Sequence, residues 1–258
     1  MGSIILNNMI SEKSVKASKT IILRKVAKDD IKGVKTYTNI EDLSKKSYKA
    51  DIVFIAIKPQ DSEKTLKILK DSQISHEKTI FVSILAGKKL SFFEDIFGSD
   101  AKIVRSMPNL GIQESQGILL YQENSNINQK ESVILDKIFQ RFGLAYKITD
   151  EKLFDPLTAL FGSGPAYLFL LQDVFSQITN KFKVSKKDSD DLVKQLFLGS
   201  ALLSCNSEDD FKKLKENVTS KGGVTKAGVD VLEDQDSLKN LFSKTIDNAN
   251  KRSKELSK

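Results

Sequence analysis

The strongest constraint on this 258-residue chain is a change in the spacing of its apolar residues near residue 152. Before that point, short apolar runs rich in Ile, Val and Phe alternate with amphipathic stretches. After it, apolar residues recur every three or four positions over long spans. The first pattern is typical of a parallel sheet covered by helices, and the second of packed helices. The spacing therefore predicts two domains, residues 1–151 and 152–258.

The first domain is predicted to be a doubly wound α/β unit. The expected strands cover residues 20–23, 50–57, 78–84, 102–106, 117–122 and 144–148. The first four are apolar enough to be buried on both faces. Helical spacing fills residues 40–46, 62–72, 90–97 and 132–142. Strands connected through helices in this way favour a parallel sheet with helices on both sides.

The second domain is predicted to be all helical. Long helices are expected over residues 166–182, 188–204 and 236–256. The first of them is apolar nearly all round, which is typical of a helix buried among other helices, including those of a partner subunit.

Composition excludes several classes of site and partner. A single cysteine, Cys205, rules out an internal disulfide framework and a paired-cysteine metal site, and no metal is expected. The only histidine, His76, lies in a polar stretch and is expected to be a solvated loop residue. The net charge of +7 comes from lysines spread beside acidic residues, which disfavours nucleic acid as a partner. No export or membrane signal is apparent, so we expect a cytoplasmic protein without a membrane partner.

Small and turn-forming residues follow three predicted strands. Ala56, Ile57, Lys58 and Pro59 end one strand, Leu85, Ala86 and Gly87 end the next, and Met107 lies in the VRSMPN segment that ends a third. Each motif alone is compatible with an ordinary strand end. Because ligands of open parallel sheets bind outside the carboxyl ends of the strands, the three together predict one binding crevice.

Two further features indicate anionic ligands. Arg24 and Lys25 follow the strand at 20–23, where basic groups accommodate a ribose phosphate and favour NADPH over NADH, although adjacent basic residues by chance explain them equally well. Gly-Ser-Gly-Pro at 162–165 and Gly222-Gly223 before Val224 each precede a predicted helix. Ser163 could cap and Pro165 suits a first turn, so free amides there could bind a carboxylate, or the motifs could be plain capping.

Five segments, read in order, resemble the signature segments of pyrroline-5-carboxylate reductases. They are AIKPQ, SILAG, VRSMPN, TALFGSGPAY and TSKGGVTKAGVDVLE, and the resemblance covers nearly the whole chain. The segment GVKTYTN, which contains Asn39, is also similar to the family's stretch near the cofactor adenosine.

The resemblance implies that the chain reduces L-1-pyrroline-5-carboxylate to L-proline, the last step of proline biosynthesis, by hydride transfer from NADPH, with NADH possible. It implies a homo-oligomer formed through the helical domain, a dimer or an assembly of dimers. The implied cofactor-binding residues are Met1, Gly2, Arg24, Lys25, Asn39, Ala56, Ile57, Lys58, Pro59, Leu85, Ala86, Gly87, Met107 and Asn217. The implied substrate-binding residues are Ser163, Pro165, Glu208, Gly222, Gly223, Val224 and Thr225, with Thr225 also as the catalytic residue that hydrogen-bonds the ring nitrogen.

The chain departs from the family pattern at its start. Met1 and Gly2 match only the end of the family's glycine loop, and the strand before that loop is absent. The expected fold is therefore a Rossmann-like doubly wound parallel sheet lacking its first strand, followed by an all-helical dimerisation domain. A start upstream of Met1, or a catalytically impaired remnant that keeps only the helical oligomerisation domain, would each explain this. Another NADP-dependent dehydrogenase with a helical second domain is the remaining enzyme alternative, and a nucleic-acid binder is the weakest.

Overall fold

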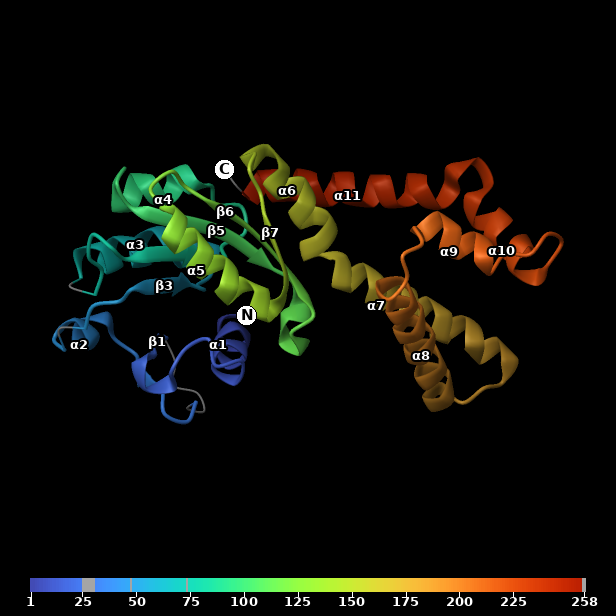
Figure 1. The fold of residues 1–258 in the computed structure, drawn as a ribbon, viewed down its shortest axis with the longest axis horizontal. Coiled ribbons are helices and arrows are strands. Elements are labelled where there is room, and N and C mark those ends of the chain that lie inside the picture. The colour runs from blue at the N-terminus through green and yellow to red at the C-terminus, as the bar shows by residue number, and fades with distance from the viewer. Residues whose placement is uncertain (25–30, 47, 73, 257–258) are drawn as a thin grey trace. The chain divides into compact units, whose positions relative to one another are not determined.

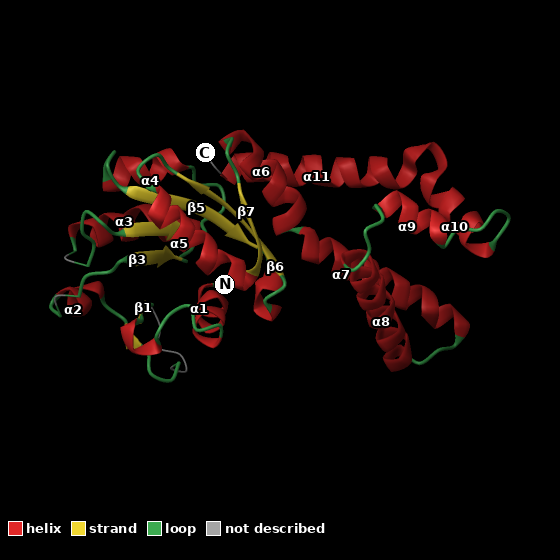
Figure 2. Ribbon diagram, viewed as in Figure 1, coloured by secondary structure: helices red, strands yellow, loops and turns green. Residues whose placement is uncertain are grey.

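The computed structural model describes residues 1–24, 31–46, 48–72 and 74–256, with the backbone alone for Pro59 and Leu256. These residues form two compact units. The first holds residues 1–163 and 249–258, and the second holds residues 164–248. All strands lie in the first unit, and the second is helical (Figure 2). The division falls later than the predicted boundary at residue 151 because the segment that follows still packs on the sheet. Phe154, for example, is fully buried against Leu120 and Ile148.

The described strands and helices follow the predicted order closely (Figure 1). The strands are β1 Ile21–Leu23, β2 Lys35–Tyr37, β3 Ile52–Ile55, β4 Ile80–Ser83, β5 Lys102–Pro108, β6 Gly117–Glu123 and β7 Gly143–Lys147. The helices of the first unit are α1 Gly2–Ser11, α2 Ile40–Ser44, α3 Ser62–Asp71, α4 Leu90–Phe97, α5 Gln129–Phe139 and α6 Phe154–Leu157. Those that follow are α7 Gly164–Thr179, α8 Lys186–Cys205, α9 Phe211–Asn217, α10 Val224–Glu233 and α11 Ser237–Leu256.

The strands form a two-stranded sheet, β1-β2, and a five-stranded sheet in the order β3-β4-β5-β6-β7. Every described pairing is parallel except that of β5 with β6. The predicted doubly wound parallel sheet is therefore confirmed, with β6 antiparallel to β5 as a local difference. Residues 109–116 between β5 and β6 are too few for the crossover that a parallel connection requires, so the chain turns back antiparallel.

The burial of β1 and β3 is a second difference from the prediction. These strands were predicted to be buried on both faces, but Leu23 of β1 is exposed and β3 is only partly buried except at Ile55. Within the described ranges no strand pairs with both of them, so each has neighbours on one side only. This arrangement agrees with a Rossmann-like sheet lacking its first strand.

Alternating residues of the central strands build a core on each face of the larger sheet. Val82 and Val104 face α1 and α5, where they pack with Ile5, Leu135 and Phe139. The neighbouring residues Phe81 and Ile103 face α3 and α4, where they pack with Leu66 and Phe93. Because successive side chains of a strand point to opposite faces, two adjacent residues serve both cores, and helices cover both sides (Figure 1).

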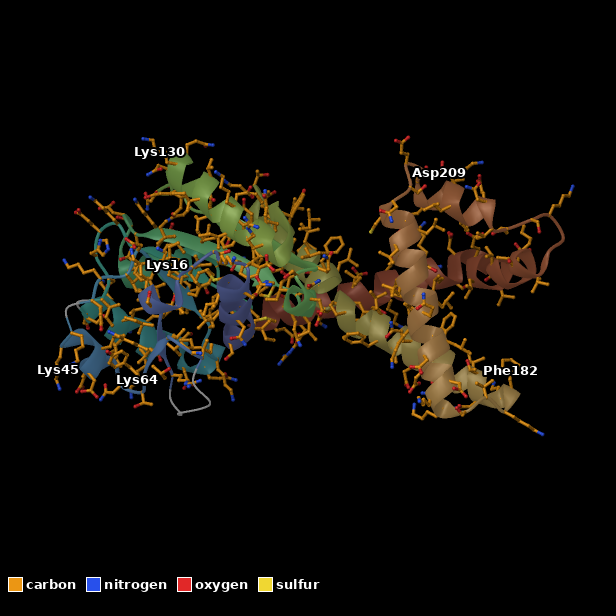
Figure 3. All side chains as sticks on the ribbon, turned by 60° about the horizontal axis from the view of Figure 1, so that its bottom comes forward. Lys16, Lys45, Lys64, Lys130, Phe182 and Asp209 are labelled. Carbon is orange, nitrogen blue, oxygen red and sulfur yellow. The ribbon has the colours of Figure 1, made fainter. Side chains whose placement is uncertain are left out.

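The second unit exposes much of its apolar surface. Leu168, Phe169 and Leu170 are consecutive residues of α7, and each is more than half exposed. Figure 3 labels Phe182, which lies at the turn after α7 and is 71% exposed. No described helix is long and apolar enough to cross a membrane.

Charge is spread over the first unit rather than gathered in a stripe. Figure 3 labels Lys16, Lys45, Lys64 and Lys130, which lie on different parts of the unit. Lys45 pairs with Asp42 at 3.4 Å, and Lys67 pairs with Glu63 at 2.7 Å, as mixed-sign surfaces do.

Candidate functional site: a crevice at the strand ends and a helix start in the helical unit

The carboxyl ends of three parallel strands meet at one edge of the sheet. Ile55 of β3 pairs with Ser83 of β4, which pairs with Arg105 of β5, so the residues that follow them lie side by side. After β3, Ala56 and Lys58 are exposed and Ile57 is half-buried, and the backbone then enters a short turn at Pro59–Asp61. After β4, Leu85 and Gly87 are buried and Ala86 is exposed, while Met107 near the end of β5 is half-buried. The predicted convergence of these strand ends is confirmed.

The N-terminus of α1 lies at this same edge. A Cβ atom added to Gly2 would come within 2.9 Å of the Ala56 Cβ, so the helix start touches the end of β3. No side chain caps α1, and its first turn carries no acidic residue. The first amides of a helix without a cap are donors that point outward, and the helix dipole adds positive potential there. The edge thus offers an anion site beside small residues.

The smaller sheet presents a second group of polar side chains. β1 and β2 run parallel, so Arg24 and Asn39 emerge at the same end, where the Arg24 amide donates to Tyr37 O at 3.0 Å. Asn39 caps α2 by accepting from the Glu41 amide at 2.8 Å. Lys25, the other predicted phosphate-binding residue, lies outside the described residues.

Beside Asn39 is a cluster that the sequence analysis did not identify. Lys35 Nζ donates to the Tyr48 hydroxyl at 2.9 Å, and the Tyr37 and Tyr48 rings meet edge to face at 6.4 Å. The hydrogen bond from Lys35, then that from Tyr37, lowers the pKa of Tyr48. No local motif brings Tyr48, which follows α2, back to β2.

The loop after β4 is held by strand residues. Ser83 Oγ accepts from the Leu85 amide at 3.1 Å, and Ser106 Oγ donates to Ser83 O at 3.0 Å. Gly87 has a φ of +76°, a backbone conformation that L side chains rarely adopt. The loop therefore turns sharply at Gly87, and Ala86 is exposed at the end of the sheet where the three strands meet.

The Gly-Ser-Gly-Pro segment is not the free helix start that was predicted. Ser163 has helical backbone angles and ends a π-helical turn, Thr158–Gly162, that leads on from α6. Its amide donates to Thr158 O at 3.2 Å, so it continues a helical path instead of capping a new one. The wider turn precedes Pro165, which has no amide to donate and whose ring disfavours a regular α-helical turn.

The Gly222-Gly223 segment does precede a helix, as predicted. Gly223 is the N-cap residue of α10, with no side-chain cap, and Gly222 turns the chain with a φ of +73°. Val224 is 94% exposed and Thr225 is also exposed, so the first turn of α10 is open. Like α1, α10 therefore begins with amides that no N-cap side chain caps.

Glu208 and Asn217 belong to the neighbouring part of the helical unit. Glu208 is exposed in the loop before α9. Asn217, the last residue of α9, donates to Asp209 Oδ2 at 3.1 Å, which places it beside that loop. Within the described residues, no three His, Cys, Asp or Glu side chains are grouped to hold a metal.

An open α/β unit whose parallel strands end in small residues beside an uncapped helix N-terminus has the arrangement that doubly wound sheets use to bind dinucleotides. Such a unit joined to a helical second unit is typical of nicotinamide-dependent oxidoreductases.

Comparison with known proteins identifies the family. Residues 151–256 match the family model described as pyrroline-5-carboxylate reductase dimerisation. The pyrroline-5-carboxylate reductase of Aquifex aeolicus is 33% identical over 207 residues, which is 80% of this chain and 76% of the relative. That of Arabidopsis thaliana is 34% identical over 229 residues, covering 87% and 79%. The solved pyrroline carboxylate reductase of Plasmodium falciparum with NADP bound is 27% identical, with a TM-score of 0.87 and coverage of 100% and 95%. The chain belongs to the pyrroline-5-carboxylate reductase family.

Proposed function

We propose that this chain reduces L-1-pyrroline-5-carboxylate to L-proline with NADPH as the hydride donor. Family membership over most of the chain is the observation that carries the proposal. The strand ends suit the cofactor because Ala56 and Ala86 are small and exposed, and the uncapped start of α1 lies beside Ala56. NADPH supplies the hydride when bound, so the chemistry required of the protein is positioning and electrostatics.

The roles of the crevice residues follow from their places. The N-terminus of α1, at Met1 and Gly2, would hold the pyrophosphate. The strand-end segments around Lys58 and Ala86 would border the nicotinamide half of the cofactor. Arg24, with Lys25, would face a phosphate on the adenosine ribose, which favours NADPH over NADH, and Asn39 lies at the same end of the smaller sheet.

The helical unit would supply the substrate site. Open amides at Val224 and Thr225 suit a carboxylate, and the Thr225 hydroxyl can hydrogen-bond the ring nitrogen directly or through a water. Ser163, Pro165, Glu208, Gly222, Gly223 and Asn217 complete the proposed substrate and cofactor contacts of this half. The first turn of α10 is exposed in a single chain. A dimer that covers this turn would exclude water from the proposed substrate site.

The test measures loss of NADPH absorbance with pyrroline-5-carboxylate. We expect turnover in the wild-type protein and an approximately 10-fold or greater fall in kcat/KM for Thr225→Ala, the scale of one lost active-site hydrogen bond. Thr225→Ser keeps the hydroxyl and serves as the matched control. Unchanged kinetics for Thr225→Ala would remove Thr225 from the mechanism, and a wild-type protein that self-associates without turnover would favour the non-catalytic alternative.

A further inference from the structure

A buried arginine lies in the middle of the central strand, β5, where it pairs with Ser83 at the carboxyl end of β4. Arg105 on β5 is 2% exposed. Its Nη1 donates to Glu151 Oε1 at 3.1 Å, its Nη2 donates to Asp155 Oδ1 at 2.8 Å, and its guanidinium stacks 3.9 Å from the Phe154 ring. A buried charge is tolerated only when it is paired and hydrogen-bonded, so these two carboxylates are required partners.

Glu151 has a second contact that reaches back to the crevice. The same oxygen, Oε1, accepts from the Leu90 amide at 3.1 Å. Leu90 is the first residue of α4, and its N-cap residue, Lys89, makes no side-chain hydrogen bond to the helix. Helix starts are normally capped by the N-cap residue itself. Here the carboxylate of Glu151, which is distant in sequence, accepts from the first amide of α4. The guanidinium of Arg105 holds that carboxylate in place.

The segment between these contacts is the loop proposed to border the cofactor. Ser83 holds its beginning through the Leu85 amide, and Glu151 holds its end through the Leu90 amide. Gly87 lies between them with a positive φ and gives the loop access to other conformations. Among the described residues, Glu151 is the side chain that accepts from the Leu90 amide, so its loss would release the end of the loop.

We propose that Glu151, oriented by Arg105, is a positioning residue that holds the loop from Leu85 to Lys89 in the conformation that receives the cofactor. The inference rests on the proposed function, since it takes this loop as a border of the NADPH site. A loop that is already ordered binds more tightly, because binding need not supply the ordering free energy. Release of the loop should therefore weaken NADPH binding more than it alters substrate binding.

The chain offers a matched control on the same strand. Lys102, at the amino end of β5, pairs with Glu131, which takes part in the capping box of α5. Both glutamates thus pair with a cation of β5 and help to cap a helix. Glu131 lies at the opposite end of the strand from the crevice, so its loss reports on stability alone.

The experiment compares Glu151→Ala, Glu151→Asp and Glu151→Gln with Glu131→Ala. It measures NADPH binding by fluorescence, KM for NADPH and for pyrroline-5-carboxylate, and hydrogen exchange of the Leu90 amide without cofactor. We expect Glu151→Ala to raise the Kd and KM for NADPH about 10-fold, the scale of one charge-assisted hydrogen bond, and to speed exchange at Leu90. Glu151→Asp keeps the charge, but its shorter side chain cannot reach the Leu90 amide. It should raise the Kd and KM for NADPH as Glu151→Ala does, and it tests the inference if Glu151→Ala folds poorly.

Glu151→Gln retains an acceptor and should return the Kd to within about threefold of the wild-type value. Glu131→Ala should leave the Kd for NADPH unchanged. Equal Kd values for the Glu151 and Glu131 variants, or an equal rise in both KM values, would overturn the inference. A wild-type protein that does not bind NADPH would instead overturn the proposed function, so the two failures are distinguishable.

Discussion

At the scale of single residues, Asn109 connects two motifs that lie far apart in the sequence. Its Oδ1 accepts from the amides of Gly111 and Ile118, and its Nδ2 donates to Phe161 O at 3.1 Å. Phe161 is four residues before Pro165, which has no amide to donate to that carbonyl. Asn109 therefore supplies a donor that the proline cannot provide, and it connects the MPN segment to the residue that precedes the GSGP segment.

This pairing predicts a specific energetic coupling. Asn109→Ala should lower the free energy of unfolding by about 3 kcal/mol, from three part-buried hydrogen bonds of roughly 1 kcal/mol each. In a Pro165→Ala background the loss should be about 1 kcal/mol smaller, because the new amide can donate to Phe161 O. Urea unfolding of the four proteins measures both values.

Asn126 provides the control for that cycle. It donates to Ser99 O and Ala101 O at a site remote in sequence from Pro165. Asn126→Ala should be additive with Pro165→Ala. Additivity of Asn109→Ala as well would contradict the proposed pairing.

The fall of the free energy of unfolding at acid pH should depend in part on Glu131. Burial alone would raise its pKa, but the hydrogen bond and charge of Lys102 and the hydrogen bond from Asn128 lower it below 4.5. A lowered folded-state pKa gives stability that is present above the pKa of the unfolded chain and is lost as pH falls through the folded value. The stability difference between wild type and Glu131→Gln should thus be constant near neutral pH and shrink below about pH 4.5. Urea midpoints across this range would measure it, and a difference that stays constant would contradict the assignment.

At the scale of elements, α1 packs on the core through Ile5 and Met9 and is hydrogen-bonded to the segment after β5 by Asn8. Asn8 is buried and donates to Ile112 O at 3.0 Å and to Ser115 Oγ at 2.9 Å. Its neighbour Asn7 is exposed, and among the described residues it makes no comparable side-chain hydrogen bond. The helix whose start would hold the pyrophosphate is thus positioned from its far side.

Replacing the two asparagines in turn tests this anchor. Asn8→Ala should lower the free energy of unfolding by about 2 kcal/mol and also weaken NADPH binding, because two hydrogen bonds that place α1 are lost. Asn7→Ala should change stability by less than about 0.5 kcal/mol. Equal effects of the two substitutions on urea unfolding would show that α1 is not held through Asn8.

The sequence predicts elements well where a local pattern determines them. The apolar runs ending at Ile55 and Ser83 and the helix from Leu90 were predicted within a few residues. The short, partly exposed β2 has no apolar pattern and was not predicted as a strand. The antiparallel direction of β6 depends on the short connection from β5. The spacing of apolar residues does not indicate the direction of a strand.

The candidate site was predictable to a similar extent. Strand ends converge in any parallel sheet, so Ala56 and Ala86 could be placed together from sequence alone. Arg105 and Glu151 could not, because their contact joins positions 46 residues apart and neither belongs to a local motif. The capping role expected of Ser163 was wrong because the preceding helical path continues through it.

At the scale of the whole molecule, the exposed apolar helices indicate self-association. The matching family model is itself described as a dimerisation segment. Phe169→Lys on α7 should weaken self-association about 30-fold or more, the scale of a lost aromatic anchor. Ile134→Lys on α5, at a position 54% exposed compared with 55% for Phe169, is the matched control in the first unit. Light scattering at several concentrations would measure both, and an unchanged mass for Phe169→Lys would place the interface elsewhere.

The return of residues 249–258 to the first unit has a consequence for how the protein is made. Ser253 Oγ donates to Asp155 Oδ1 at 3.2 Å, so contacts of the first unit involve residues synthesised after the whole of the second. A growing polypeptide folds in the order in which it leaves the ribosome only if each domain is continuous. Here the described strands are all synthesised before the second unit, but the contact of Ser253 with Asp155 forms only after residues 164–248 have been translated. A nascent chain stalled within α10 would leave that surface of the first unit uncovered and accessible to chaperones.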